Sequence, residues 1–405
     1  MKKFFRSLSV FTAAVSAALF VLCAVTAYLT PSELRVEAYN SDLINGSFPL
    51  SVKYDEAQSA AAEPGGYSAS KASIMLFDAV PVKEVDITVS DRMYVDVSGK
   101  PFGIRIYTDG LVVSSVTPVT TGSGEKCPAA DAGISQGDVI LTADGKALTT
   151  NEQLLAAVRE SGGSPLAITA RGSTGGYTAS VRPVFDSSAG EYKIGLMVKD
   201  SCAGIGTMTF VDSRSGVFAG LGHGICDSMS GSIMPLENGD IVSAEITSVR
   251  KSVCGSPGSL CGSFTSSSPL GAIRLNSDKG VYGCMDFSQL PAYSTLQKIP
   301  VAYKQEVVRG KAQILAAIEG TAPELFDVEI EDISYNNANT AKNMIIRITD
   351  KRLLELTGGI VQGMSGSPII QNGMLAGAVT HVFVNDPTRG YAVFSENMIK
   401  ESESF

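Results

Sequence analysis

Gly363-Met364-Ser365-Gly366-Ser367-Pro368, near the C-terminal end of the chain, determines how the other segments are interpreted. Glycines on both sides of a serine allow backbone conformations that other residues avoid, so this run predicts a tight turn leading into a strand. In such a turn the serine hydroxyl can project while nearby N–H groups point inward, where they can hold a negatively charged oxygen. The alternative is an ordinary Ser/Gly turn between two strands.

The run resembles the nucleophile turn of trypsin-like serine proteases, which has the pattern G-x-S-G-[GS]-P. This resemblance implies that Ser365 is the nucleophile and that the backbone N–H groups of Gly363 and Ser365 form the oxyanion hole. A hydroxyl is a weak nucleophile at neutral pH and needs an adjacent base. The chain has only two histidines, and His223, which stands between glycines after an apolar strand, is the better candidate. The alternative is a turn histidine without a catalytic role.

A catalytic triad also needs a carboxylate that fixes the tautomer of the histidine. Generic trypsin-like spacing favours a position near Asp278 or Asp286, but physical reasoning from the sequence does not choose among several aspartates. The candidates are Asp227, Asp240, Asp278, Asp286, Asp327, Asp332 and Asp350.

Two longer blocks carry a narrower resemblance. Residues 358–373, which contain the serine turn, and residues 378–391 are similar to the C-terminal blocks of the stage IV sporulation protein B family. These are serine peptidases of endospore-forming Firmicutes. The block Leu221-Gly222-His223-Gly224 occurs in the same order, so the resemblance covers nearly the whole chain.

Carried over by position, the family's triad falls on His223, Asp350 and Ser365. Asp350, in an I-T-D-K setting, departs from ordinary trypsin-like spacing and could instead cap a short helix over 350–356. His381 lies on the strand that borders the substrate in trypsin-like folds, which suggests a place in the S1 pocket. A core or supporting role for His381 is the alternative.

The N-terminus resembles a membrane anchor. Lys2, Lys3 and Arg6 precede an uncharged apolar stretch that is long enough to span a bilayer, which predicts a transmembrane helix within residues 1–30 and a cytoplasmic N-terminus. A cleaved signal peptide is the alternative. Residues 31–96 are predicted to be a stalk with some strand, centred on the small residues of 60–66.

Residues 97–184 resemble a bacterial PDZ domain. Residues 128–140 match the signature A-G-[IL]-x-x-G-D-x-I, and residues 150–161 have the pattern of an amphipathic helix beside the groove. The resemblance implies that Phe102, Gly103 and Ile104 form the loop that binds a peptide C-terminus. A domain that only braces its neighbour is the alternative.

Residues 185–405 contain many short, glycine-punctuated strands without βαβ alternation, which indicates a barrel or sandwich. The predicted fold class is mainly β, with a transmembrane helix, a PDZ domain and a trypsin-like double β-barrel. The net charge of −9 argues against a nucleic-acid partner. The seven cysteines lack a tight metal spacing, and a Cys254–Cys261 disulfide or reduced thiols both remain open. Neither a metal nor a cofactor is predicted, because the implied chemistry needs only a base-activated nucleophile and oriented donors.

The family resemblance implies a membrane-anchored signalling endopeptidase, with its N-terminus in the forespore cytoplasm and its catalytic domain in the space facing the mother cell. Such an enzyme cleaves itself and then the regulatory subunit of a membrane protease complex, and that complex activates sigma-K. Peptide termini are the implied ligands of the PDZ domain. Two alternatives are a catalytically inactive PDZ scaffold and an envelope quality-control protease of the HtrA kind, in which the PDZ domain usually follows the catalytic domain.

Overall fold

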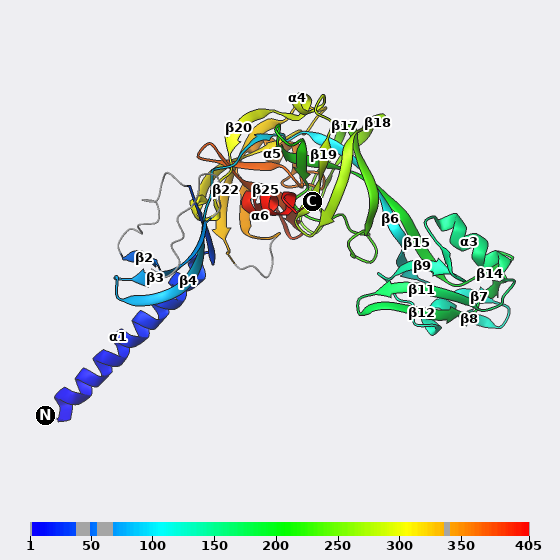
Figure 1. The fold of residues 1–405 in the computed structure, drawn as a ribbon, viewed down its shortest axis with the longest axis horizontal. Coiled ribbons are helices and arrows are strands. Elements are labelled where there is room, and N and C mark those ends of the chain that lie inside the picture. Colours follow the sequence, from blue (N-terminus) through cyan, green and yellow to red (C-terminus); the bar gives the residue numbers. More distant parts are fainter. Residues whose placement is uncertain (1, 38–48, 55–67, 336–340, 405) are drawn as a thin grey trace.

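A long apolar helix begins the part of the chain that the computed structural model describes, which comprises residues 2–37, 49–54, 68–335 and 341–404 (Figure 1). Helix α1 (Lys2–Leu29) projects away from the β structure. Its segment Ser9–Leu29 has a hydropathy of 2.3 and is not buried by the rest of the chain. This length and composition are compatible with a single-pass membrane anchor.

A four-stranded sheet follows the helix, where the sequence predicted a stalk. Alternating apolar side chains cover one of its faces and form a small core of Val36, Ala72, Ile74, Val85 and Ile87. Residues 60–66, the predicted centre of the stalk, lie outside the described residues. The order of the sheet is β1-β4-β3-β2, with β1 (Glu33–Val36), β2 (Leu50–Tyr54), β3 (Ser68–Leu76) and β4 (Val80–Val89).

The first β-barrel is a ring in which each strand pairs with the next and β6 closes onto β15. Its core is apolar and includes Phe102, Met208 and Phe218. The ring runs β6 (Pro101–Val116), β17 (Leu236–Arg250), β18 (Ser259–Ser277), β19 (Gly280–Met285), β16 (Val217–Gly220) and β15 (Leu196–Val211). Beside it lie β5 (Tyr94–Val97), β20 (Leu296–Pro300) and the short helix α4 (Leu290–Tyr293).

A PDZ-like unit, residues 110–199, is inserted between two strands of this barrel. Strands β6 and β15 are long because each runs from the barrel into the unit, where they remain paired from Val112 with Lys199 to Val116 with Leu196. The elements between them are β7 (Val119–Thr121), β8 (Gly124–Lys126), α2 (Pro128–Asp131), β9 (Val139–Ala143), β10 (Lys146–Ala147), α3 (Asn151–Glu160), β11 (Leu166–Gly172), β12 (Gly175–Val181), β13 (Val184–Asp186) and β14 (Glu191–Lys193).

This insertion corrects the predicted domain order. The sequence suggested a complete PDZ domain over 97–184 followed by a complete peptidase domain over 185–405, whereas β5 and the first part of β6 belong to the barrel and precede the PDZ-like unit. Figure 1 shows the unit at the end of the β6–β15 ribbon, on the side of the molecule opposite α1. The catalytic fold therefore surrounds the PDZ-like unit in sequence.

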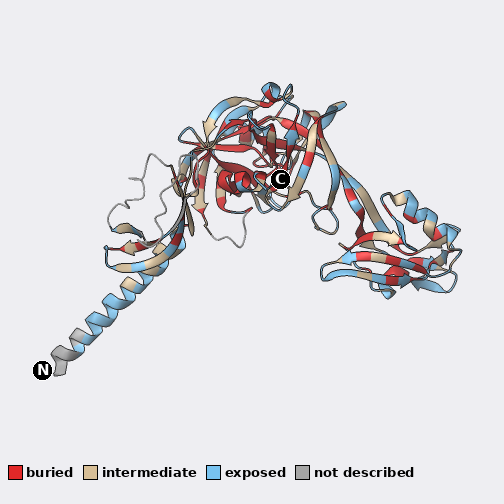
Figure 2. Cartoon of the chain, viewed as in Figure 1, coloured by how far each residue is buried: buried red, intermediate tan, exposed pale blue. Residues whose placement is uncertain are grey.

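The second β-barrel is closed by six strands in the order β21-β22-β23-β26-β25-β24. Buried residues of both barrels, among them Phe210, Tyr282 and Leu375, form one shared cluster, and Figure 2 shows burial concentrated in the two barrels. The elements are a 3₁₀ helix η3 (Lys304–Glu306), β21 (Gly310–Ala316), β22 (Glu324–Ile333), β23 (Met344–Ile348), α5 (Lys351–Thr357), β24 (Pro368–Gln371), β25 (Met374–Phe383), β26 (Asp386–Phe394) and α6 (Ser395–Ser402).

Candidate active site

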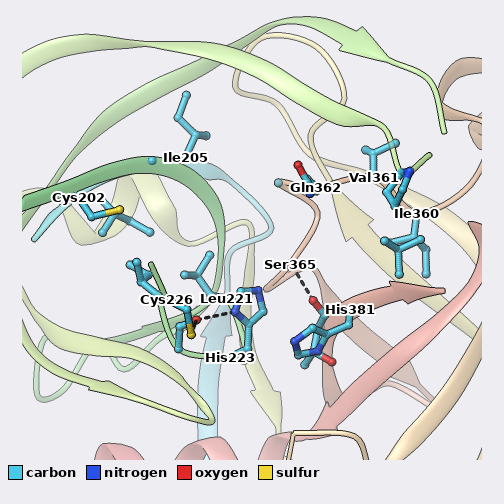
Figure 3. Close-up of a pocket in the computed structure, with 18 of the residues that line it drawn as sticks. Cys202, Ile205, Leu221, His223, Cys226, Ile360, Val361, Gln362, Ser365 and His381 are labelled. Atoms are coloured by element: carbon cyan, nitrogen blue, oxygen red, sulfur yellow. Dashed lines mark hydrogen bonds between the residues drawn. The ribbon is translucent and has the colours of Figure 1, made fainter. Parts of the chain in front are cut away.

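A cleft of ≈ 670 Å³ lies between the two barrels and contains the serine and both histidines singled out in the sequence (Figure 3). His223 comes from the first barrel, whereas Ser365 and His381 come from the second. Apolar side chains such as Leu221 and Ile360 line much of the rest of the cleft. The structure thus brings together the predicted nucleophile and the predicted base, which are far apart in the sequence.

Ser365 lies in the nucleophile loop, residues 363–367, which leads into β24. Gly363 and Gly366 have φ angles of +98° and +93°, a region that favours glycine, so the predicted tight turn is present. The Ser365 hydroxyl donates a hydrogen bond of 2.7 Å to the carbonyl of Thr380 (Figure 3). The nucleophile therefore rests on the neighbouring strand β25 and must turn away from it to meet the base.

The backbone of this loop is oriented for an oxyanion hole. The carbonyl of Gln362 accepts a hydrogen bond of 2.7 Å from the N–H of Leu260 in β18. Because the C=O and N–H of a trans peptide point in opposite directions, this bond turns the N–H of Gly363 away from β18. Within the described part of the chain, the N–H groups of Gly363 and Ser365 donate to no protein acceptor. Both donors named from the sequence are thus available to a substrate oxygen.

His223 lies in the histidine loop, residues 221–225, directly after β16. Its Nδ1 is 2.8 Å from the carbonyl of Gly224 (Figure 3). Since a carbonyl only accepts, this contact assigns the hydrogen to Nδ1 and leaves Nε2 as the basic nitrogen. Burial lowers the pKa of His223 below its ordinary value, although the bond to Gly224 opposes the shift. The side chain is therefore a neutral base at neutral pH.

Asn276, at the end of β18, holds the histidine loop in place. Its side-chain oxygen accepts from the N–H of Ile225 at 2.8 Å, and its amide donates to the carbonyls of Ile225 at 3.0 Å and Met234 at 2.9 Å. All three contacts lie within the first barrel. No sequence signal singled out Asn276, because its partners are distant along the chain.

His381 lies beside His223. The ring centroids of His381 and His223 are 4.8 Å apart, and the planes are tilted by 37°. Burial, the nearby His223 and the charge of Lys342 lower the pKa of His381 to about 4. His381 is thus uncharged at neutral pH, and its assignment to the S1 pocket stays a prediction.

Asp350 does not lie with the other two proposed triad residues. Its carboxylate accepts from the N–H of Leu353 at 2.9 Å as the N-cap of α5, and from the N–H of Asp327 at 3.4 Å. Asp350 does not line the cleft, whereas Asp278, in the turn between β18 and β19, does. The structure therefore favours the helix-capping alternative for Asp350, because the I-T-D-K motif marks the passage from β23 into α5.

The three residues assigned to a peptide-binding loop lie in the first barrel instead, and Ile104 lines the cleft. Phe102, Gly103 and Ile104 are in β6, where they pair with β15 on one side and β17 on the other. Phe102 is fully buried and packs edge-on against Phe218, with ring centroids 6.2 Å apart. A strand that is paired on both sides cannot receive a peptide, so this assignment is corrected.

The cysteines are free thiols, so the proposed Cys254–Cys261 disulfide is not formed. Cys202 and Cys226 line the cleft, and burial raises the pKa of both thiols, which keeps them protonated at neutral pH.

Two packed β-barrels with a serine and a histidine across the cleft define a serine endopeptidase of the trypsin-like class. Among solved structures, a protease from M. tuberculosis in its active form is 14% identical over 49% of this chain and 72% of its own, with a TM-score of 0.30. An HtrA-type protease solved with a decapeptide is 12% identical over 53% of each chain, with a TM-score of 0.28. The PDZ domain of an SdrC-like protein from Listeria monocytogenes is 24% identical over 23% of this chain and 90% of its own, with a TM-score of 0.19. No curated protein sequence matches the chain.

The family is shown by a direct match. The model of the SpoIVB peptidase S55 family matches residues 190–399. The chain belongs to this family.

Proposed function

We propose that the chain is a signalling serine endopeptidase of sporulation, which cleaves itself and then the regulatory subunit of the membrane protease complex that activates sigma-K. Membership of the SpoIVB peptidase family supports the biological role. The observation that carries the chemistry is the placement of Ser365 and His223 in one cleft, beside two unpaired backbone N–H groups.

The proposed reaction is acyl transfer. The Ser365 hydroxyl leaves the Thr380 carbonyl, gives its proton to Nε2 of His223, and attacks the substrate carbonyl carbon. The resulting oxyanion accepts hydrogen bonds from the N–H groups of Gly363 and Ser365. His223 then returns the proton to the departing amine, and water hydrolyses the acyl-enzyme by the same steps. Asp278 lines the cleft, and its carboxylate is the one proposed to stabilise the imidazolium.

The proposed topology follows from the N-terminal segment. Helix α1 spans the inner forespore membrane with the basic N-terminus in the forespore cytoplasm, and the barrels face the mother cell. The PDZ-like unit binds peptide termini of the substrate or of this chain. An HtrA-like role in quality control remains the second candidate, and breadth of substrate separates the two. A signalling peptidase leaves unfolded casein largely intact.

The test uses the full-length chain in detergent micelles. We expect the wild type to react with a fluorophosphonate probe and to cleave itself, whereas Ser365→Ala does neither. Ser367→Ala is the matched control, because Ser367 is buried in the same loop and its hydroxyl has no partner among the described residues. Labelling that persists in Ser365→Ala would assign the nucleophile to another residue, and a wild type that neither labels nor cleaves would favour the inactive scaffold.

A further inference from the structure

We propose that Thr207 is the positioning residue that fixes the nucleophile loop of the second barrel against the histidine loop of the first. This inference rests on the proposed function and deepens it. Thr207 lies in β15, is 3% exposed, and is absent from the set of residues that line the cleft. It acts through other residues and does not touch the substrate.

Thr207 uses each of its polar groups to join the two loops. Its hydroxyl donates to the carbonyl of Gly363 at 2.8 Å, and its N–H donates to the carbonyl of Ser365 at 3.1 Å. Its own carbonyl accepts at 3.2 Å from the N–H of Leu221, two residues before His223. A single residue thus contacts an oxyanion donor, the nucleophile and the start of the histidine loop.

The backbones of the nucleophile loop, of Thr207 and of Leu221 approach one another closely, which restricts the two loops to one relative position. A Cβ atom at Gly366 would collide with the carbonyl of Thr207 and with the N–H of Leu221. A Cβ atom at Gly220 would stand 3.2 Å from the same carbonyl. Leu221 itself has a φ of +66°, which is strained for a leucine. Gly366 in the nucleophile loop and Gly220 at the end of β16 therefore permit the contact with Thr207, and the packing leaves little room for an alternative register.

The hydroxyl of Thr207 has a specific role in the oxyanion hole. It donates a hydrogen bond to the carbonyl of Gly363 itself, while the N–H of Leu260 donates to the carbonyl of Gln362, the residue before Gly363. With both flanking carbonyls fixed, the N–H of Gly363 is held in a single direction. Loss of the hydroxyl leaves the Gly363 carbonyl without this donor and frees the Gly363–Met364 peptide, while Leu260 still holds the peptide that carries the N–H of Gly363. The backbone between the two oxyanion donors, Gly363 and Ser365, is then less rigid, so the pair is less well preorganised for the transition state.

The experiment measures fluorophosphonate labelling rates of the full-length chain in detergent for Thr207→Val, which removes only the hydroxyl, and for Thr207→Ser, which keeps it. Thr108→Val is the matched control, because Thr108 is 1% exposed in the partner strand β6 and its hydroxyl also donates to a backbone carbonyl, that of Gly110. We expect labelling by Thr207→Val to slow about tenfold, with Thr207→Ser and Thr108→Val within about threefold of wild type.

A second measurement separates this proposal from the proposed function. Hydrogen exchange of residues 360–368 reports the anchoring of the loop without catalysis, and we expect faster exchange in Thr207→Val than in Thr108→Val. Equal labelling rates and equal exchange in these two variants would overturn the role of Thr207. If the wild type does not label, the proposed function fails, and the exchange comparison alone decides whether Thr207 positions the loop.

Discussion

The two loops that meet in the cleft are held in different ways. The histidine loop is fixed from within its own barrel, by the three hydrogen bonds of Asn276 and by the bond between His223 and Gly224. The nucleophile loop is held within its own barrel, by the bonds of Gly366 to Val379 and of Ser365 to Thr380, and also across the interface, by Thr207 and Leu260 of the first barrel. The difference teaches that the base is placed by the folding of one barrel, whereas the loop of the serine gains its full set of contacts only when the two barrels dock.

The strongest test of this comparison concerns the carboxylate that serves the base. If Asp278 of the first barrel is the carboxylate that serves His223, Asp278→Asn should lower the rate of fluorophosphonate labelling by about 10²–10⁴-fold, because an amide cannot stabilise the imidazolium. Asp350→Asn should label within about twofold of wild type, because asparagine caps a helix about as well as aspartate.

The pair of variants is informative in both directions. Asp278 is exposed and Asp350 is only partly buried, so neither substitution is expected to unfold the protein. A large loss of labelling in Asp350→Asn, with Asp278→Asn unaffected, would restore the family-based assignment of Asp350. It would also require α5 to release the carboxylate from the N–H of Leu353.

A smaller effect is expected when the internal support of the histidine loop is removed. Asn276→Ala leaves two carbonyls and one N–H without their partner, so labelling should slow about tenfold and the apparent melting temperature should fall. The two readouts should move together, because the histidine loop belongs to the core of its own barrel. A variant that melts like wild type and labels at the wild-type rate would show that other contacts suffice to hold His223.

The smallest expected effect is on the pH dependence of labelling. The neutral form of His223 is the active one, and burial lowers its pKa below the ordinary 6.5, so the rate should fall with decreasing pH with a midpoint below 6.5. His381→Gln should keep this midpoint within the same range, because His381 gains its proton only at about pH 4. A midpoint above 6.5 would indicate a carboxylate close enough to Nδ1 to outweigh burial.

Local features of the site were predictable from the sequence. The glycines around Ser365 indicated a turn with left-handed backbone angles, and the structure has them at Gly363 and Gly366. The pattern of residues 150–161 indicated a helix, and α3 begins after Thr150 with a capping box that includes Gln153. Each of these signals depends on residues within a few positions of one another.

Features that depend on distant partners were not predictable. The bond between Thr207 and Gly363 joins residues 156 positions apart, and a threonine in a strand carries no sign of such a partner. The motif around Phe102 was misread because a glycine-punctuated apolar run suits both a PDZ loop and an ordinary barrel strand, and only the pairing with β15 and β17 separates them. The sequence left two interpretations of Asp350 open because an aspartate is a suitable residue both for a helix cap and for a catalytic acid.

The insertion of the PDZ-like unit into the β6–β15 ribbon has a consequence for the order of assembly. Pairing two strands that are far apart in sequence lowers the conformational entropy of the chain between them. This entropy is lost before the contacts between the strands can compensate for it. Here the inserted unit has its own core and pairs Val116 with Leu196, so its folding brings the two strands together before the barrel forms. Ser365 emerges from the ribosome after all strands of the first barrel, and its loop lacks the contacts of Thr207 and Leu260 until that barrel is complete. A newly made chain is therefore expected to acquire its peptidase activity as the final event of folding.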